Sequence, residues 1–258
     1  MPPEILIVLP TLGQRPDYLE LTLKSIREQS VPADIVVVAP EPQSLIAELS
    51  TRYGCELLPD PGSQTAAINL GVKSAREHHK FVNWIGDDDT LTVNSLERTS
   101  SALRQNPQAV VAFGACEYID GDGKELWVSR AGKWATRILS WGPDLIPQPG
   151  MLVKLSAWHA VGGVDTSLRF AFDLDLLLKL RQHGTFLDVG EVVSQFRWHS
   201  ESLTVSDRTS SLNESEDVKR RYLSPVARRF AWVWEKPVRG ATRLAARGVT
   251  RRARSISR

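Results

Sequence analysis

The chain has 258 residues, of which 42% are hydrophobic and 24% charged, so it can bury a sizeable core and is not of the polar, highly charged class that stays unfolded. No stretch reaches the roughly 18 apolar residues of a membrane span, and the amino end lacks a basic segment followed by an apolar one. Cys55 and Cys116 lie far apart without partners at metal-ligand spacing, which excludes a disulfide framework. We therefore expect a cytoplasmic protein in a reducing compartment.

The formal net charge of +2 conceals two regions of opposite sign. From position 219 onward the chain carries 13 lysines and arginines against one acid, a net charge of +12, which leaves −10 for the residues before it. Only this basic extension is expected to seek an anionic partner, and we favour phospholipid headgroups over nucleic acid. The alternative is a solvated extension without a partner.

The first half of the chain alternates short apolar runs with segments of helical periodicity. The apolar runs cover residues 5–9, 35–38, 56–58 and 81–85, and the helical segments cover residues 16–29, 44–53 and 64–77. This alternation is typical of strand-helix-strand units that feed a largely parallel sheet. We predict an α/β fold with a mostly parallel central sheet.

Three adjacent aspartates, Asp87, Asp88 and Asp89, follow directly after the apolar run 81–85. In open α/β sheets ligands bind beyond the carboxyl ends of the strands, so these carboxylates lie where a site is expected. Because neighbouring carboxylates repel one another, a hard cation such as Mg²⁺ or Mn²⁺ with oxygen ligands would neutralise them. The alternative is that Asp88 or Asp89 caps a helix that begins near Thr92, or that all three are solvated.

The second half of the chain has fewer regular patterns. A strand is predicted at residues 110–113, and the turn at 120–123 sends the chain back through a partner strand at 126–128. The segment 134–149 is rich in Pro and Trp and has no clean period, which predicts a mobile active-site loop. A helix with acidic residues in its first turn covers residues 172–180 and ends before Gly184.

Four segments in this order and spacing resemble the family 2 glycosyltransferases, inverting enzymes of the GT-A fold. They are ILIVLPTLGQRPDYLELTLKSIREQ, GSQTAAINLGVKSA, FVNWIGDDDTLTVNSLE and GGVDTSLRFAFDLDLLLKL, and the resemblance covers residues 4–205. It implies a three-layer α/β/α sandwich. In the family, the loop after the first strand contacts the donor nucleotide. The residues that match this loop are Pro10, Thr11 and Arg15.

The resemblance also assigns the acidic cluster and two further positions. The nucleotide-side carboxylate of the family maps onto Asp88 and its metal ligand onto Asp89, with Asp87 in the variable position. Asn69 matches a polar residue commonly found near the donor, with an ordinary polar place on a helix face as the alternative. Many members carry an acidic residue after the second strand that reads the base. This chain has Ala39 and Pro40 there, and Glu41 is the nearest substitute.

Asp173 matches the catalytic base of the family, at the start of the helix 172–180. Typical members have an acidic residue immediately before this Asp, whereas this chain has Phe172. The alternative for Asp173 is a helix-terminal charge stabilised by the helix macrodipole. His199 lies in the segment RWHSES, which resembles a late motif whose His approaches the metal or the diphosphate. A structural role beside a Trp is its alternative.

The resemblance implies that a sugar is moved from a nucleoside-diphosphate sugar to a hydroxyl of a glycan or a lipid-linked acceptor, with the help of Mn²⁺ or Mg²⁺. A cell-surface glycan precursor, as in cell-wall polysaccharide synthesis, is the acceptor that we favour. We expect a catalytic domain at residues 1–212 and a basic, helical or partly disordered extension at 213–258. This extension would make the protein peripheral on the inner face of the membrane.

Two other classes of protein compete with this interpretation. A non-catalytic sugar-nucleotide binder, derived from a transferase that lost its activity, is suggested by the departures at Phe172 and Ala39. A phosphohydrolase of the haloacid dehalogenase type would use an Asp-x-Asp motif, which Asp87 and Asp89 match. That motif normally follows the first strand and continues with Thr or Val, where this chain has Leu91. A dinucleotide enzyme is disfavoured because the sequence has no Gly-x-Gly-x-x-Gly motif.

Overall fold

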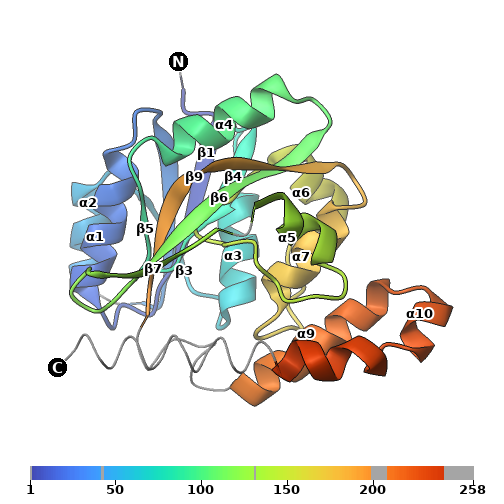
Figure 1. Ribbon diagram of the computed structural model, residues 1–258. Helices are drawn as coiled ribbons and strands as arrows, with labels where there is room; N and C mark the ends of the chain where they lie inside the picture. The colour runs from blue at the N-terminus through green and yellow to red at the C-terminus, as the bar shows by residue number, and fades with distance from the viewer. Residues whose placement is uncertain (1, 42–43, 131, 199–207, 241–258) are drawn as a thin grey trace.

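The fold was analysed in a computed structural model that describes residues 2–41, 44–130, 132–198 and 208–240 (Figure 1). Its centre is a nine-stranded sheet in the order β3-β2-β1-β4-β8-β6-β9-β5, with β7 paired to β6 outside this path. No helix in the described part of the chain has the length and apolar character needed to cross a bilayer.

The first half of the chain builds the parallel side of the sheet. Its strands are β1 (Ile5–Pro10), β2 (Ala33–Ala39), β3 (Glu56–Pro59) and β4 (Phe81–Trp84), joined by the helices α1 (Pro16–Arg27), α2 (Ser44–Arg52) and α3 (Gln64–Lys73). β1 pairs in parallel with both β2 and β4, and β2 with β3. β1 is buried along its whole length, because both of its faces are covered by helices.

The second half adds strands of both directions. They are β5 (Thr90–Leu91), β6 (Ala109–Ile119), β7 (Glu125–Ser129), β8 (Leu152–Lys154) and β9 (Thr185–Arg197). β8 runs antiparallel to both β4 and β6, whereas the long strands β6 and β9 are parallel to each other. The turn at 120–123 joins β6 to β7 as predicted, and Asp120 N–H donates to the Lys124 carbonyl at 2.9 Å.

Helices cover both faces of the sheet (Figure 1). The remaining helices of the core are α4 (Ser95–Gln105), α5 (Gly132–Ile138), α6 (Leu155–Val161) and α7 (Phe172–Leu180). Apolar residues of α1, α2 and α4 pack with Ile5, Ile7 and Leu9 of β1 on one face. Those of α3, α5, α6 and α7 pack with Leu6 and Val8 on the other. The predicted three-layer α/β/α fold with a mostly parallel sheet is confirmed.

One close approach in the core depends on glycine. A Cβ on Gly71 of α3 would lie 2.4 Å from Cγ1 of Val8, well inside van der Waals contact. The missing side chain therefore lets α3 lie directly against β1. This contact fixes the helix beside the strand whose end carries Thr11.

The segment 134–149 is only in part the irregular loop that the sequence predicts. Its first residues belong to α5, whereas residues 139–149 form no helix or strand. Asn83 Nδ2 donates to the Pro149 carbonyl at 2.8 Å, and Gln148 Nε2 donates to the Trp84 carbonyl at 2.5 Å, so the end of the segment is tied to β4. The helical start was missed because Trp and Pro side chains hide the helical period, and the mobility of the loop stays a prediction.

Of the carboxyl-terminal helices, α9 (Arg208–Tyr222) lies beside α7 (Figure 1). It is followed by α10 (Pro225–Arg229) and the helical residues 232–240. Val218 of α9 is fully buried and belongs to the same core cluster as the apolar residues of α7. α9 is therefore integrated into the packed body, and it begins before the predicted boundary at 212.

Candidate functional site

The acidic run follows β4 at the carboxyl end of the parallel strands, as predicted. Thr11, directly after β1, donates its hydroxyl to Asp87 Oδ2 and accepts a hydrogen bond from Gly13 N–H at 2.9 Å. Burial raises the pKa of Asp87, and the Thr11 hydroxyl opposes this rise. The loops after β1 and β4 therefore meet through side chains that the sequence placed in one site.

Arg15 holds the second aspartate of the run. Its Nη1 lies 3.2 Å from Asp88 Oδ2, and both side chains are largely shielded from solvent. Gly86 leaves room for the carboxylates: Asp88 Oδ1 and Asp89 Oδ2 lie 2.9 and 3.2 Å from the point where a Cβ on Gly86 would be. One oxygen of each carboxylate thus faces the same small space above Gly86.

Asp89 is the most buried member of the run, with 4% of its surface exposed. The Arg197 N–H, at the end of β9, donates to Asp89 Oδ1 at 3.0 Å, and no donor among the described residues reaches Oδ2. Burial, followed by the nearby Asp88 charge, raises the pKa of Asp89 well above its ordinary value. A buried carboxylate with one uncommitted oxygen next to a second carboxylate suits a divalent cation with oxygen ligands.

Arg197 organises this end of the sheet and was not predicted from the sequence. Its guanidinium donates to the carbonyls of Asp88, Asp120 and Gly121 at 2.9–3.1 Å and lies over the Tyr18 ring, 4.4 Å from the centroid. It therefore ties β9 to the acidic run and to the β6–β7 turn. In the sequence, Arg197 is marked only by its place beside the Trp and His of the late motif. Its guanidinium binds backbone carbonyls, which every residue has, so no residue type reveals its partners.

Asp173 lies in the first turn of α7, and α7 has the predicted bounds, Phe172–Leu180. The Leu174 N–H donates to Asp173 Oδ1 at 2.7 Å. The rings of Trp84 and Phe172 lie 6.2 Å apart. Since Trp84 ends the strand that leads to the aspartates and Phe172 precedes Asp173, this contact brings the start of α7 to the acidic run. It also gives Phe172 a packing role where the family has an acid.

Asp144 lies near Asp173, and sequence reasoning missed it. Burial, followed by the charge of Asp173, raises the pKa of Asp144, while the Ile146 N–H bond and Lys219 oppose the rise. Burial also raises the pKa of Asp173. Both residues retain partial exposure, and the charge of Asp173 acts on Asp144, so the two carboxyl groups lie near each other. Asp144 is an isolated acid in a stretch rich in Pro and Trp and has no pattern of its own.

Glu214 of α9 caps the start of α7. Its Oε1 accepts from the Arg169 N–H at 3.0 Å, and its Oε2 accepts from the N–H groups of Phe170 and Ala171 at 2.5 and 2.7 Å. These donors precede the first turn of α7, where a carboxylate is favoured by the helix dipole. The Glu214 charge also contributes to the raised pKa of Asp173. The carboxyl-terminal extension therefore reaches the predicted catalytic helix directly.

Asp175 is buried and contacts the extension. Tyr222 donates its hydroxyl to Asp175 Oδ1 at 2.8 Å, and Lys179 Nζ lies 2.7 Å from Oδ2, although the angle is poor for a hydrogen bond. Burial raises the pKa of Tyr222, and the hydrogen bond to Asp175 and the charge of Asp175 raise it further. Asp175 thus holds α9 against α7, whereas Asp173 retains partial exposure.

The other predicted donor residues have different surroundings. Pro10 is the last residue of β1, beside Thr11. The Asn69 side chain donates to the Val164 carbonyl at 2.9 Å and accepts from the Val164 N–H at 3.1 Å, which favours the structural alternative for this residue. Glu41 is exposed after β2. His199 lies outside the described residues.

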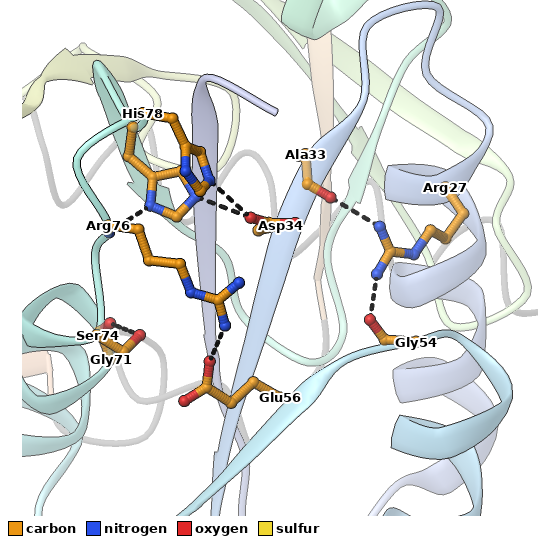
Figure 2. Close-up of polar contacts among 10 residues, drawn as sticks. Arg27, Ala33, Asp34, Gly54, Glu56, Gly71, Ser74, Arg76 and His78 are labelled. Atoms are coloured by element: carbon orange, nitrogen blue, oxygen red, sulfur yellow. Dashed lines mark hydrogen bonds and ion pairs between the residues drawn. The ribbon is translucent and has the colours of Figure 1, made fainter. Parts of the chain in front are cut away.

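A second group of titratable side chains lies at the opposite, amino ends of the strands (Figure 2). In the chain as described, Asp34, His78 and His79 are the one group of three potential metal ligands whose ligating atoms all lie within 4.8 Å of one another. The Nε2 atoms of His79 and His78 lie 3.0 and 3.3 Å from Asp34 Oδ2. By spacing, these residues could hold a metal ion.

The hydrogen bonds of His79 favour a proton on its Nε2 atom over a metal ion bound to that atom. The Arg76 N–H donates to His79 Nδ1 at 2.9 Å, so the proton of the neutral ring lies on Nε2 and points to Asp34. A metal ion on Nε2 would move that proton to Nδ1, against the Arg76 N–H. The side chain of His79 is almost fully buried.

Comparisons with known proteins agree with this arrangement. No model of a known protein family matches the chain. The chain is 21% identical over 234 residues to an uncharacterised glycosyltransferase of Haemophilus influenzae, and the alignment covers 87% of this chain and 79% of that protein. It is 22% identical over 237 residues to an uncharacterised glycosyltransferase of Rickettsia prowazekii, covering 88% and 73%.

Solved structures share the fold at low sequence identity. The mannosyltransferase PcManGT from Pyrobaculum calidifontis, in complex with GDP-Man and Mn²⁺, matches with a TM-score of 0.67 and 16% identity, over 96% of this chain and 76% of that chain. S. aureus TarS 1-349, in complex with UDP, matches with a TM-score of 0.59 and 14% identity, over 85% and 70%. Against a longer S. aureus TarS structure (TM-score 0.59, 15% identity), the match covers 88% of this chain and 43% of that chain.

These similarities support an enzyme of the glycosyltransferase class. The relatives carry that name, and the fold is shared with a mannosyltransferase over almost the whole chain. The mixed α/β fold with a mostly parallel sheet is thus similar to that of glycosyltransferase structures, in agreement with the fold that the sequence implies.

Proposed function

We propose that the protein is an inverting, metal-assisted glycosyltransferase of family 2 that transfers a sugar from a nucleoside-diphosphate sugar to an acceptor hydroxyl. One observation carries the proposal. The Trp84–Phe172 contact brings the acidic run after β4 and the start of α7 to the same end of the sheet. An inverting transfer needs both, because the leaving diphosphate and the attacking hydroxyl lie on opposite sides of the anomeric carbon.

The donor would bind at the acidic run and the loop after β1. Two of the solved structures with this fold contain UDP or GDP-Man, which supports a nucleotide-sugar donor. Asp89, together with Asp88, would hold Mn²⁺ or Mg²⁺ through the oxygens that face the space above Gly86. Such an ion, when bound, supplies positive charge to the departing diphosphate. Thr11 positions Asp87 next to these two aspartates, and Arg15 positions Asp88.

Asp173 would accept the proton of the acceptor hydroxyl. The residue retains partial exposure, and its backbone contact with the Leu174 N–H fixes one oxygen of the carboxylate. The raised pKa brings this carboxyl group nearer to neutral pH, where it becomes a better base while still losing its proton. The nearby Asp144 would hold its proton to higher pH than Asp173 does, since ionised Asp173 raises the pKa of Asp144.

Several finer assignments belong to the same proposal. The acceptor would be a glycan or a lipid-linked precursor of the cell surface, and His199 would approach the metal. Residues 1–212 would form the catalytic unit, and the basic extension at 213–258 would bring it to the cytoplasmic face of a membrane. The acidic run follows β4 and not β1, which is unfavourable for the phosphohydrolase alternative.

A thermal-shift screen of nucleotide sugars, with and without Mn²⁺, tests donor binding. We expect one nucleotide to raise the melting temperature only when Mn²⁺ is present, because a ligand that binds the native state alone stabilises it. Release of nucleoside diphosphate from the same donor then separates an enzyme from a non-catalytic binder. Stabilisation without release favours the binder, and no stabilisation by any nucleotide sugar contradicts both.

A further inference from the structure

Ionic contacts join the last described helix, residues 232–240, to α9. Arg220 of α9 reaches Glu235 with Nε–Oε1 and Nη2–Oε2 distances of 2.8 and 2.6 Å. Arg239 reaches back to α9, donating from Nε to Glu216 Oε1 at 2.8 Å and from Nη2 to Asn213 Oδ1 at 2.9 Å. These contacts clamp residues 225–240 onto α9, and the small residue Ala231 is buried between them.

Large apolar side chains are exposed in the same segment. Val226 of α10, Phe230 in the turn after α10, and Val233 of the helix 232–240 are exposed by 70%, 50% and 53%. Trp232, at the start of that helix, is exposed by 61%. Packing within this chain does not explain these four side chains, because they face water while Arg220 and Arg239 hold the segment onto α9 through their acidic partners.

Exposed cations lie between and beside these apolar residues in the sequence. Arg229, between Val226 and Phe230, and Lys236, three residues after Val233, are both exposed. Arg228 is also exposed. Glu235 is the single acid from 224 to 240, and its carboxylate is occupied by Arg220. The exposed surface of this segment is therefore both apolar and positive.

We propose that the exposed surface of residues 225–240 docks on the surface of an anionic phospholipid bilayer. Its exposed apolar side chains would enter the boundary between headgroups and acyl chains, and Arg229 and Lys236 would contact lipid phosphates. A second copy of the chain is a poor occupant, because pairing two such faces would bring cations together without acids to oppose them. The sequence continues beyond 240 with six arginines and no acid, which adds to the same attraction.

Vesicle co-sedimentation with the full chain tests this proposal without any catalytic step, so its failure and the failure of the proposed transferase function are distinguishable. We expect partition onto vesicles of phosphatidylcholine with phosphatidylglycerol and at least tenfold weaker partition onto phosphatidylcholine alone. The double variant Phe230→Ser/Val233→Ser and the double variant Arg229→Gln/Lys236→Gln should each bind anionic vesicles on the order of tenfold more weakly.

Two control variants change the same residue types on other exposed surfaces. Leu45→Ser/Val93→Ser removes exposed apolar groups, and Lys73→Gln/Lys124→Gln removes exposed cations. Both should partition like the unchanged chain. Equal partition of the Phe230→Ser/Val233→Ser variant and the unchanged chain overturns the proposal. Sedimentation velocity without lipid gives a second test: a dimer that this variant converts to a monomer would show that the face binds protein.

Discussion

Two pairs of carboxylates lie at the same end of the sheet but are held in place by different contacts. Asp88 and Asp89 follow a strand directly, and partners from β9 and the loop after β1 contact them. Asp144 and Asp173 come from a segment tied to β4 and from a helix start, with Lys219 and Glu214 as the charges nearest to them. Burial raises the pKa of Asp89 in the first pair and of both members of the second.

The surroundings of the first pair suit the binding of a cation, whereas those of the second pair suit the uptake of a proton. In the first pair, one oxygen of each residue faces a shared space at close range, which is the geometry of a cation site. In the second pair, Asp173 accepts a hydrogen bond from one backbone N–H and retains partial exposure, which suits the proposed base. Substitutions in the two pairs should therefore have separable effects on donor binding and on proton transfer.

The largest effect is expected from Asp89→Asn, which keeps the Arg197 N–H bond and removes the charge. A unit charge pair at about 4 Å and an effective dielectric of about 20 is worth roughly 4 kcal/mol, or about three decades of rate. We expect turnover to fall by at least that factor and Mn²⁺-dependent donor affinity to be lost, measured by calorimetry. Unchanged donor affinity with Mn²⁺ would remove Asp89 from the cation site.

Asp173→Asn should affect the chemical step alone. The side chain can still accept from the Leu174 N–H, so the helix start is preserved. Loss of a positioned base typically lowers rates by about 10² to 10⁴, and donor affinity should stay within about twofold. Steady-state kinetics and calorimetry on the same preparation check both expectations. A loss of less than tenfold in kcat would assign the proton transfer to another group.

A smaller effect is expected from Glu214→Gln. Removing this negative charge should lower the pKa of Asp173, and Asp173 must be ionised to act as a base, so the acidic limb of the kcat/KM profile should move to lower pH. The weakened cap should also cost about 1 kcal/mol of stability. Glu216→Gln, on the same helix but paired with Arg239, is the matched control and should leave the profile in place. An unmoved limb in both variants contradicts the role of Glu214.

The smallest effect is expected at the amino ends of the strands, from His79→Gln. Burial lowers the pKa of His79, so the unfolded chain binds a proton there more readily than the folded one below about pH 6.5. Stability should therefore decline as pH falls from 6.5 toward the lowered pKa. The variant should flatten this decline in urea unfolding at pH 7.5 and 5.5, with activity unchanged. The exposed His183→Gln should behave like the unchanged chain.

The strand and helix pattern of the first half was predictable because each element has a local signal. β1, β2 and β4 are short apolar runs, and α1 begins at Pro16 with apolar residues at helical spacing. The place of the acidic run followed from the same pattern, since Asp87 comes directly after a buried strand. The helix of Asp173 was also predicted, because its apolar and acidic residues are local.

Other members of the site could not be predicted, because their partners lie far away in sequence. Arg197 reaches the acidic run across 108 positions through its backbone N–H, a group that every residue except proline has. Glu214 reaches the start of α7 across more than 40 positions, and nothing in its own sequence context marks it as a cap.

The sequence by itself determined the fold class, the position of the aspartates at a strand end and the start of the helix that carries Asp173. These features depend on periodicity and on the direction of parallel strands, and both are written into short stretches of chain. Only the tertiary structure decided that Asp144 lies near Asp173, that Glu214 of α9 caps the helix that carries Asp173, and that residues 225–240 expose large apolar side chains. Those outcomes depend on which surfaces meet when the chain folds. The burial and the electrostatic surroundings of a side chain are set by the segment that packs against it as well as by its own.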